Sequence, residues 1–266
     1  DFLGEAPDIK VPNAYLAPKS SSKGDDSWVA LQPDPARPPR SHYEMNRGDP
    51  KTEMIETQRY PYRNEKGELL GYKIRLENPK GIKDKMVLPL SYGYYKGGAE
   101  RPFWTFKGFD NGESRTLYNL DKLIENPTAK VLIVEGEKTA EAAPEKLKGL
   151  GENIVCVTWR DGSSAVSRTD WSPLVGRDVI IWPDNDAPGK FYAEKVTDFL
   201  KTKSVNSVTI LDIPIDKSEK WDAADALEEG IDAEEFMDQT TKKTIYSRKK
   251  IPILKVKQFR QDKSSI

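Results

Sequence analysis

Acidic side chains follow three apolar runs of the kind that form buried strands. They are Glu135 after residues 131–134, Asp184 and Asp186 after residues 179–182, and Asp222 after residues 208–211. Carboxylates that gather in one place repel one another and resist burial unless a cation lies among them. Oxygen ligands suit Mg²⁺ or Mn²⁺, not zinc or copper. If the runs end at one edge of a sheet, the sequence predicts a divalent-metal site there.

Each acidic segment also has a simpler interpretation. Glu135–Gly136 could be an ordinary strand-to-helix turn whose acid favours the helix N-terminus. The stretch Asp184–Asp186 could be a turn, because Asp and Asn favour such positions. Asp222 and Asp225 could merely cap and begin a helix. The combination indicates a metal site, because each acid stands at the same end of its own strand.

Basic residues near these acids are candidate phosphate contacts. Lys138 comes three residues after Glu135, about one turn into the helix that should follow, where a lysine can meet a phosphate. It could equally be a solvated surface lysine. Further candidate contacts to nucleic acid or phosphate are Lys190, Lys249 and Lys250.

The elements that must position these residues form a strand–helix rhythm after Pro127. Apolar runs at 131–134, 154–159, 179–182 and 208–211 alternate with helical stretches, among them one from Glu137, interrupted or restarted at Pro144, and one at 188–201. This order predicts an α/β domain over residues 128–240, with a doubly wound, mostly parallel sheet and helices on both faces. In such a sheet the working residues collect beyond the carboxyl ends of the strands.

The upstream residues differ in composition. Residues 1–58 hold eight prolines and no sustained periodicity, which predicts an extended Pro-rich arm or linker. Residues 59–127 alternate with period two around a turn at 64–68, which predicts a small β-rich module that ends in a short helix at 121–126. Four aromatic residues in this module are either core or a stacking platform for bases: Tyr60, Tyr62, Tyr72 and Trp104.

Composition excludes several other chemistries. The chain has one Cys and one His, so it cannot form an internal disulfide or a Cys/His zinc site, and it lacks material for Ser-His or Cys-His catalysis. Cys156 lies in an apolar run and should be a buried thiol, while His42 should lie in a solvated loop. No run is long enough to span a membrane and no signal peptide is visible, so we expect a cytoplasmic protein.

Charge is distributed unevenly along the chain. The net charge is −1, but residues 241–266 hold nine Lys or Arg against one Asp, a net charge of +8 that leaves −9 for the remainder. This basic C-terminal tail could hold a phosphate backbone without reading sequence. It could also be a solvated linker, and the two interpretations are compatible.

Two segments resemble the motifs of a known family. Residues 131–138 (Val-Leu-Ile-Val-Glu-Gly-Glu-Lys) and 180–189 (Ile-Ile-Trp-Pro-Asp-Asn-Asp-Ala-Pro-Gly) resemble the two signature motifs of TOPRIM domains. Bacterial primases, topoisomerases and OLD-type nucleases share these domains. The sequence is most similar to primase-like TOPRIM proteins of phages and mobile elements, often fused to helicases. A looser similarity extends over residues 58–230.

The resemblance implies roles for the acids. Glu135 would be a general acid/base or a metal ligand, Asp184 and Asp186 would hold Mg²⁺, and Asp222 would complete a second metal position. The chain also departs from the family. Replicative primases usually carry an Asp three or four residues after the glycine, where this chain has Lys138–Ala140. The zinc module that such primases use for template recognition is absent from the sequence.

The sequence therefore predicts a primase-like nucleotidyltransferase that uses two Mg²⁺ or Mn²⁺ ions and no zinc. Its expected catalytic residues are Glu135, Asp184, Asp186 and Lys138. Its expected partners are single-stranded DNA, nucleoside triphosphates and a helicase domain or subunit. Two alternatives stay open: a metal-dependent nuclease on the same scaffold, and a non-catalytic module that binds nucleic acid or associates with a helicase.

Overall fold

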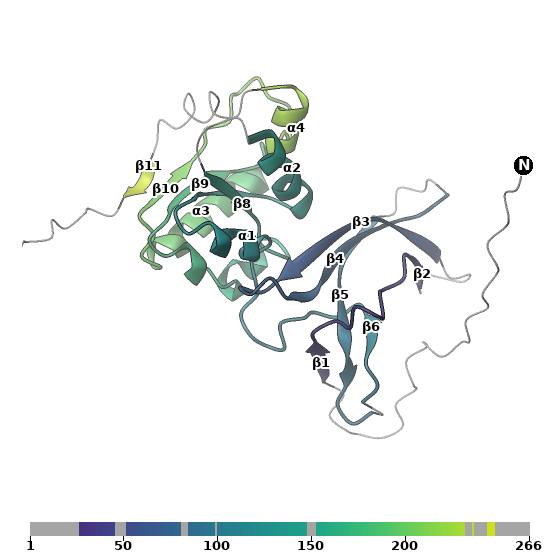
Figure 1. Cartoon of the computed structure of the whole chain (residues 1–266). Coiled ribbons are helices and arrows are strands. Elements are labelled where there is room, and N and C mark those ends of the chain that lie inside the picture. The colour runs from purple at the N-terminus through teal and green to yellow at the C-terminus, as the bar shows by residue number, and fades with distance from the viewer. Residues whose placement is uncertain are drawn as a thin grey trace, which may run out of the picture.

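A computed structural model shows a β-rich module joined to an α/β domain (Figure 1). The structure describes residues 27–45, 52–80, 85–98, 100–147, 153–231, 236 and 244–247. The two parts contact each other where the long strands of the module approach the first helices of the α/β domain (Figure 1).

The β-rich module is built on one antiparallel sheet. Its strand order is β1-β5-β4-β3-β2, and β6 also pairs with β5. The strands are β1 (Trp28–Leu31), β2 (His42–Met45), β3 (Thr52–Arg63), β4 (Leu69–Glu77), β5 (Lys85–Tyr95) and β6 (Phe103–Thr105). The predicted hairpin is β3–β4, and its turn closes with a hydrogen bond from the backbone N–H of Gly67 to the carbonyl of Asn64.

The period-two alternation of β4 divides the sheet into two faces. Ile74 and Leu76 are buried on one face with Met54 and Leu90, in a small core of the module's own. Side chains of successive residues point to opposite faces, so Lys73 belongs to the other face. That second face meets the α/β domain.

The α/β domain contains a five-stranded sheet in the order β11-β10-β9-β7-β8. Its strands are β7 (Lys130–Val134), β8 (Ile154–Val157), β9 (Asp178–Trp182), β10 (Ser207–Ile210) and β11 (Thr244–Ser247). The first four are parallel, and β11 is antiparallel to β10. Because the chain steps from β7 outward to β8 and then back across to β9, the sheet is doubly wound, as the sequence predicted.

Helices cover both faces of this sheet. On one face α2 (Glu137–Leu147) and α4 (Ala223–Glu228) share a core with residues such as Leu132 and Trp182. On the other face α1 (Leu120–Glu125), the 3₁₀ turn η1 (Ser163–Arg168) and α3 (Ala187–Lys201) pack against the alternate strand residues, such as Ile133. A second 3₁₀ turn, η2 (Ser172–Leu174), lies on the same side. The buried thiol of Cys156 is confirmed. Helix α2 runs through Pro144 rather than restarting there.

The structure differs from the expected arm over residues 27–58. In this range β1, β2 and the first part of β3 belong to the sheet, and Met54 is fully buried. The strand β1 pairs with the far end of β5, so its partner is distant in sequence and local periodicity could not reveal it. His42 is exposed, but it lies in a strand rather than a loop. Residues 1–26 lie outside the described residues.

The expected basic tail also has a structured part, because β11 falls within residues 241–266. Lys249 and Lys250 lie outside the described residues. No helix in the described part of the chain is long and apolar enough to cross a membrane.

Candidate active site

The candidate site forms where β7 and β9 end side by side. These strands are parallel neighbours, and Val134 pairs with Trp182 at their carboxyl ends. Glu135 therefore follows one strand directly, and Asp184 follows the other after a single proline. The shared edge on which the metal prediction depends is present in the structure.

The pKa values of Glu135 and Asp184 reveal a field of uncompensated negative charge. Burial, followed by the charges of Asp184 and Asp186, raises the pKa of Glu135 to about 8, against the smaller lowering effect of a backbone hydrogen bond from Asp184. Burial, followed by the charges of Asp222 and Asp186, raises the pKa of Asp184 to about 7. The charged neighbours responsible for both shifts are all acids. Such an arrangement favours either protonation or a bound cation.

The fit of the site to a divalent ion can be tested on its donor atoms. The Oε1 atom of Glu135 is buried and has no hydrogen-bond partner within the described residues, which is costly for a carboxylate oxygen. The donors at this edge are carboxylates, the ligands that Mg²⁺ prefers. As they stand, no three His, Cys, Asp or Glu side chains of the described residues are grouped so that they could hold a metal ion. The residues therefore fit a divalent ion in the chemistry of their donor atoms, but not in their present grouping.

The loop after β9 is held by its own backbone. Asp186 caps α3, since its Oδ1 accepts a hydrogen bond of 2.7 Å from the backbone N–H of Gly189. A Cβ at Gly189 would collide with the carbonyl oxygen of Asp184, so the close approach of α3 to this loop requires glycine. Asp186 thus helps to fix the conformation of the loop that carries Asp184.

Asn185 fastens the same loop to the segment before α4. Its side-chain amide donates to the carbonyls of Lys217 and Ser218 at 2.9 and 3.0 Å. Its backbone N–H donates to the carbonyl of Trp221 at 2.9 Å. This places Asp222, the next residue, beside the loop. The sequence analysis gave Asn185 no role, and only its place between two acids could have indicated one.

Asp222 caps α4, as its simpler interpretation predicted. Its Oδ1 accepts from the backbone N–H groups of Ala224 and Asp225, and the carboxylate of Asp225 accepts from the backbone N–H of Asp222. Its Oδ2 accepts from the hydroxyl of Thr139 at 3.1 Å. Asp222 still faces the acidic edge, because its charge contributes to both raised pKa values. Its role as a metal ligand stays a prediction.

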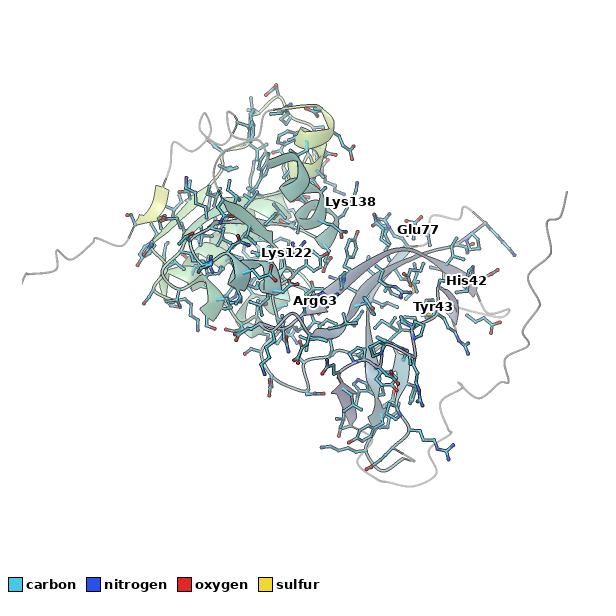
Figure 2. All side chains as sticks on the ribbon, viewed as in Figure 1. His42, Tyr43, Arg63, Glu77, Lys122 and Lys138 are labelled. Atoms are coloured by element: carbon cyan, nitrogen blue, oxygen red, sulfur yellow. The ribbon has the colours of Figure 1, made fainter. Side chains whose placement is uncertain are left out.

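Lys138, which Figure 2 labels on α2, lines a groove of about 380 Å³ whose other lining residues belong to α2 and β3. Gln58, Arg59 and Tyr60 form the β3 wall, and Lys138 and Glu141 stand on the α2 wall. Lys138 is exposed, and its nearest acid, Glu228, is 3.9 Å away. Lys190 is exposed on α3. Their contacts to phosphate stay predictions.

The aromatic residues of the module are core rather than an open platform. Tyr60 and Tyr62 are buried and belong to the main core with Tyr118. Tyr72 and Trp104 are half-buried and pack against each other, with ring centroids 5.5 Å apart. Of the two interpretations, the structure favours core packing.

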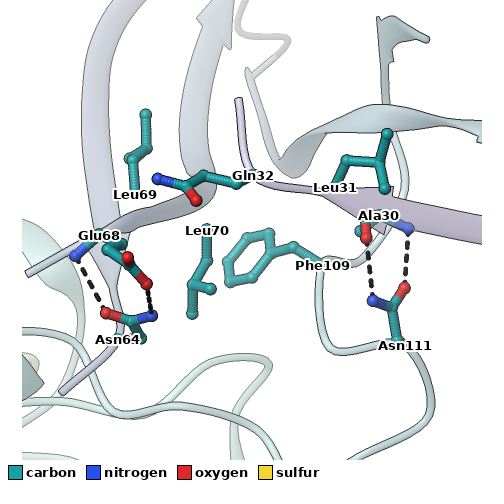
Figure 3. Close-up of a pocket in the computed structure, with 9 residues that line it drawn as sticks. All are labelled: Ala30, Leu31, Gln32, Asn64, Glu68, Leu69, Leu70, Phe109 and Asn111. Carbon is teal, nitrogen blue, oxygen red and sulfur yellow. Dashed lines mark hydrogen bonds between the residues drawn. The ribbon is translucent and has the colours of Figure 1, made fainter. Parts of the chain in front are cut away.

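A second pocket, of about 220 Å³, lies within the β-rich module (Figure 3). Leu70 and Phe109 line it, together with the polar residue Asn64. On one side the side-chain amide of Asn111 bonds both the backbone N–H and the carbonyl of Ala30, at 2.7 and 2.9 Å. The carboxylates of the candidate site are not among its lining residues.

Comparison with known proteins gives structural likeness only. No protein-family model and no curated protein matches the chain. A solved structure of bacteriophage T7 lagging-strand DNA polymerase with primase domains of two gp4 subunits, an RNA/DNA hybrid and dTTP has 13% identity and a TM-score of 0.42. That match covers 73% of this chain and 83% of the other.

Two bacterial primase structures are similar to the same extent. A DNA primase domain from Pseudomonas aeruginosa has 15% identity and a TM-score of 0.43, over 77% of this chain and 56% of the other. The E. coli primase catalytic core has 16% identity and a TM-score of 0.38, over 75% of this chain and 56% of the other. The chain thus spans little more than half of either primase. This likeness is too loose to transfer residues or functions, so the site stands on its own geometry.

Proposed function

We propose that the chain is a primase-like nucleotidyltransferase that extends a primer on single-stranded DNA with nucleoside triphosphates and Mg²⁺ or Mn²⁺. The observation that carries the proposal is the pair Glu135 and Asp184. These two half-buried acids follow the ends of adjacent strands, and the charged groups that raise their pKa values are all acids. A hard divalent cation is the partner that this arrangement lacks.

Glu135, Asp184 and Asp186 would hold the ions, and Asp222 would contribute to a second position. Ions bound there would neutralise charge on a triphosphate and lower the pKa of an attacking hydroxyl. Glu135 Oε1, which has no hydrogen-bond partner within the described residues, is placed to serve as a ligand or to take a proton. Asn185 and Gly189 keep the Asp184 loop in position.

The groove between α2 and β3 would receive the substrate phosphates. Lys138 and Arg59 provide positive charge on opposite walls. Arg59 is held by Glu56 at 2.6 Å. The exposed Lys138 has only a long ion pair with the equally exposed Glu228, at 3.9 Å, which a phosphate could replace. Lys138 is the second residue of α2, and the N-terminus of this helix also favours an anion.

A single assay tests the proposal and separates it from its alternatives. The chain is incubated with single-stranded DNA, labelled nucleoside triphosphates and Mg²⁺ or Mn²⁺, and the products are sized. Labelled products longer than one nucleotide support nucleotidyl transfer. Shortened DNA would mean a metal-dependent nuclease, and unchanged DNA without any labelled product would mean a binding module without catalysis. Either of these results overturns the proposal.

Two variants make the assay specific to the acidic edge. Asp184→Asn removes one half-buried charge with little change of shape and should abolish product formation. Asp212→Asn is the matched control, because Asp212 is an exposed acid just beyond β10 that contributes to neither raised pKa. Product formation that survives Asp184→Asn would contradict the assigned role of this residue.

A further inference from the structure

A buried polar cluster joins the two parts of the molecule beside the candidate site. Glu137, the first residue of α2, is 5% exposed. The hydroxyl of Tyr62 on β3 donates to Glu137 Oε1 at 2.7 Å. Lys73 Nζ on β4 lies 3.1 Å from the same oxygen. We call these three residues the latch.

The latch is a compensated site. A buried carboxylate is stable only when charge and hydrogen bonds satisfy it. Glu137 obtains its hydrogen bond from Tyr62 and its counter-charge from Lys73, and both partners come from the β-rich module. The side chains of Lys73 and Glu137 are 12% and 6% exposed, so solvent screens the pair little.

Residues of the latch are close in sequence to lining residues on both walls of the groove. Glu137 precedes Lys138, which lines the α2 wall, and Tyr62 lies two residues after Tyr60, which lines the β3 wall. Between Glu135 and Glu137, Gly136 takes a positive φ of 79°, a conformation that glycine adopts at no steric cost. Glu135 contributes to the acidic edge, and Glu137 meets the module.

A second contact across the same boundary supports this geometry. Arg160, in the loop after β8, is buried and pairs with Asp110 of the segment that leaves the module. Its guanidinium lies 4.0 Å from the ring centroid of Phe109 and 5.3 Å from that of Tyr62. The position of Tyr62 is thus fixed from two sides.

We propose that Glu137 is a positioning residue, which through Tyr62 and Lys73 sets the distance between the groove walls and so aligns bound substrate with Glu135 and Asp184. The inference rests on the proposed function for its effect on activity. Its structural part, a fixed separation of module and domain, is independent of that function.

The structural part is tested by a distance measurement on the full chain. Spin labels at Lys85→Cys on β5 and Glu194→Cys on α3 report the separation, since both positions are exposed and the native Cys156 is buried. The parent should give one narrow distance distribution. Glu137→Gln leaves Lys73 without a counter-charge and should broaden or shift it.

Three further variants assign the effect to the latch. Lys73→Met combined with Glu137→Gln removes both charges together and should restore the narrow distribution. Glu125→Gln, at an exposed glutamate of α1, is the matched control and should change nothing. Tyr62→Phe removes one hydrogen bond without stranding a charge, so it decides the test if Glu137→Gln does not fold. A parent-like distribution in Tyr62→Phe and in every folded Glu137→Gln sample overturns the proposal.

Activity measurements separate positioning from catalysis. Glu137→Gln should lower kcat/KM at least about tenfold, mainly through KM for the nucleotide or template, and the double variant should recover most of it. Glu135→Gln should abolish turnover without altering the label distance. If the parent forms no product, the proposed function fails while the distance measurement still judges the latch. A tenfold loss without recovery in the double variant would overturn the positioning role.

Discussion

Glu135 and Glu137 are separated by one glycine, yet their carboxylates occupy opposite environments. Glu135 faces other acids, and its Oε1 has no hydrogen-bond partner within the described residues. Glu137 is more deeply buried and is satisfied by a lysine and a tyrosine. Burial alone therefore does not mark a functional acid. What distinguishes Glu135 is burial without a cation, and the missing charge is what a ligand can supply.

The largest expected effect is on turnover at the uncompensated acid. Glu135→Gln should reduce nucleotidyl transfer at least about 100-fold, because it removes both a ligand and a proton acceptor. Steady-state rates with Mg²⁺ measure it. The same substitution should raise the melting temperature of the metal-free protein at pH 8, since one repelling charge is lost. A variant that keeps its activity would remove the contrast with Glu137.

A large effect on stability is expected at Glu137, whose charge is compensated by Lys73. Glu137→Ala strands Lys73 in a mostly buried position and should cost about 3 kcal/mol of unfolding free energy. Lys73→Met in the same chain should recover a large part of it. Urea denaturation of the two single variants and the double variant forms the cycle. Additive losses would show that the pair is not coupled.

A smaller loss of stability is expected from a substitution at Gly189, which contacts the loop after β9. Gly189→Ala places a methyl group against the Asp184 carbonyl and should destabilise the protein by about 2 kcal/mol. It should also weaken Mg²⁺ binding, since Asp184 must move. Thermal melting with and without Mg²⁺ measures both effects. Gly108→Ala is the control, because Gly108 likewise has no positive φ and a Cβ there meets only Asp110 Oδ2, at an ordinary contact distance of 3.7 Å.

The smallest expected effect is a gradual change of stability with pH. The folded-state pKa values of Glu135 and Asp184, about 8 and about 7, lie above their ordinary values of 4.5 and 3.8. The folded protein therefore keeps protons that the unfolded chain releases, so stability should fall as the pH rises from about 4 to about 8. Saturating Mg²⁺ should reduce this slope. Melting temperatures across this range, compared with those of Glu135→Gln, provide the check, and equal slopes would contradict it.

The acidic edge could be predicted because its signals are local. Glu135 and Asp184 each follow an apolar run, and parallel strands separated by helices bring such ends together. The exact set of contacts could not be predicted. Asp222 reads equally as a cap or a ligand, and the structure gives it the cap while keeping it beside the other acids.

The latch and the short strands escaped prediction for one physical reason. The partners of Glu137 are distant, and Tyr62 is 75 residues upstream. From the sequence, Glu137 looks like an acid that favours a helix N-terminus. Likewise β1 has only four residues, and its pairing with the far end of β5 leaves no local trace. Contacts between segments that are distant in the chain leave no periodic pattern in the sequence.

The amide of Asn111 has a consequence for association. An edge strand of a sheet normally exposes unpaired backbone N–H and C=O groups, which can pair with a strand of another chain. At Ala30 both groups are already engaged by one side chain, which imitates a neighbouring strand over a single residue. A second copy that tried to extend the sheet at β1 would first have to displace Asn111, so this border resists edge-to-edge aggregation.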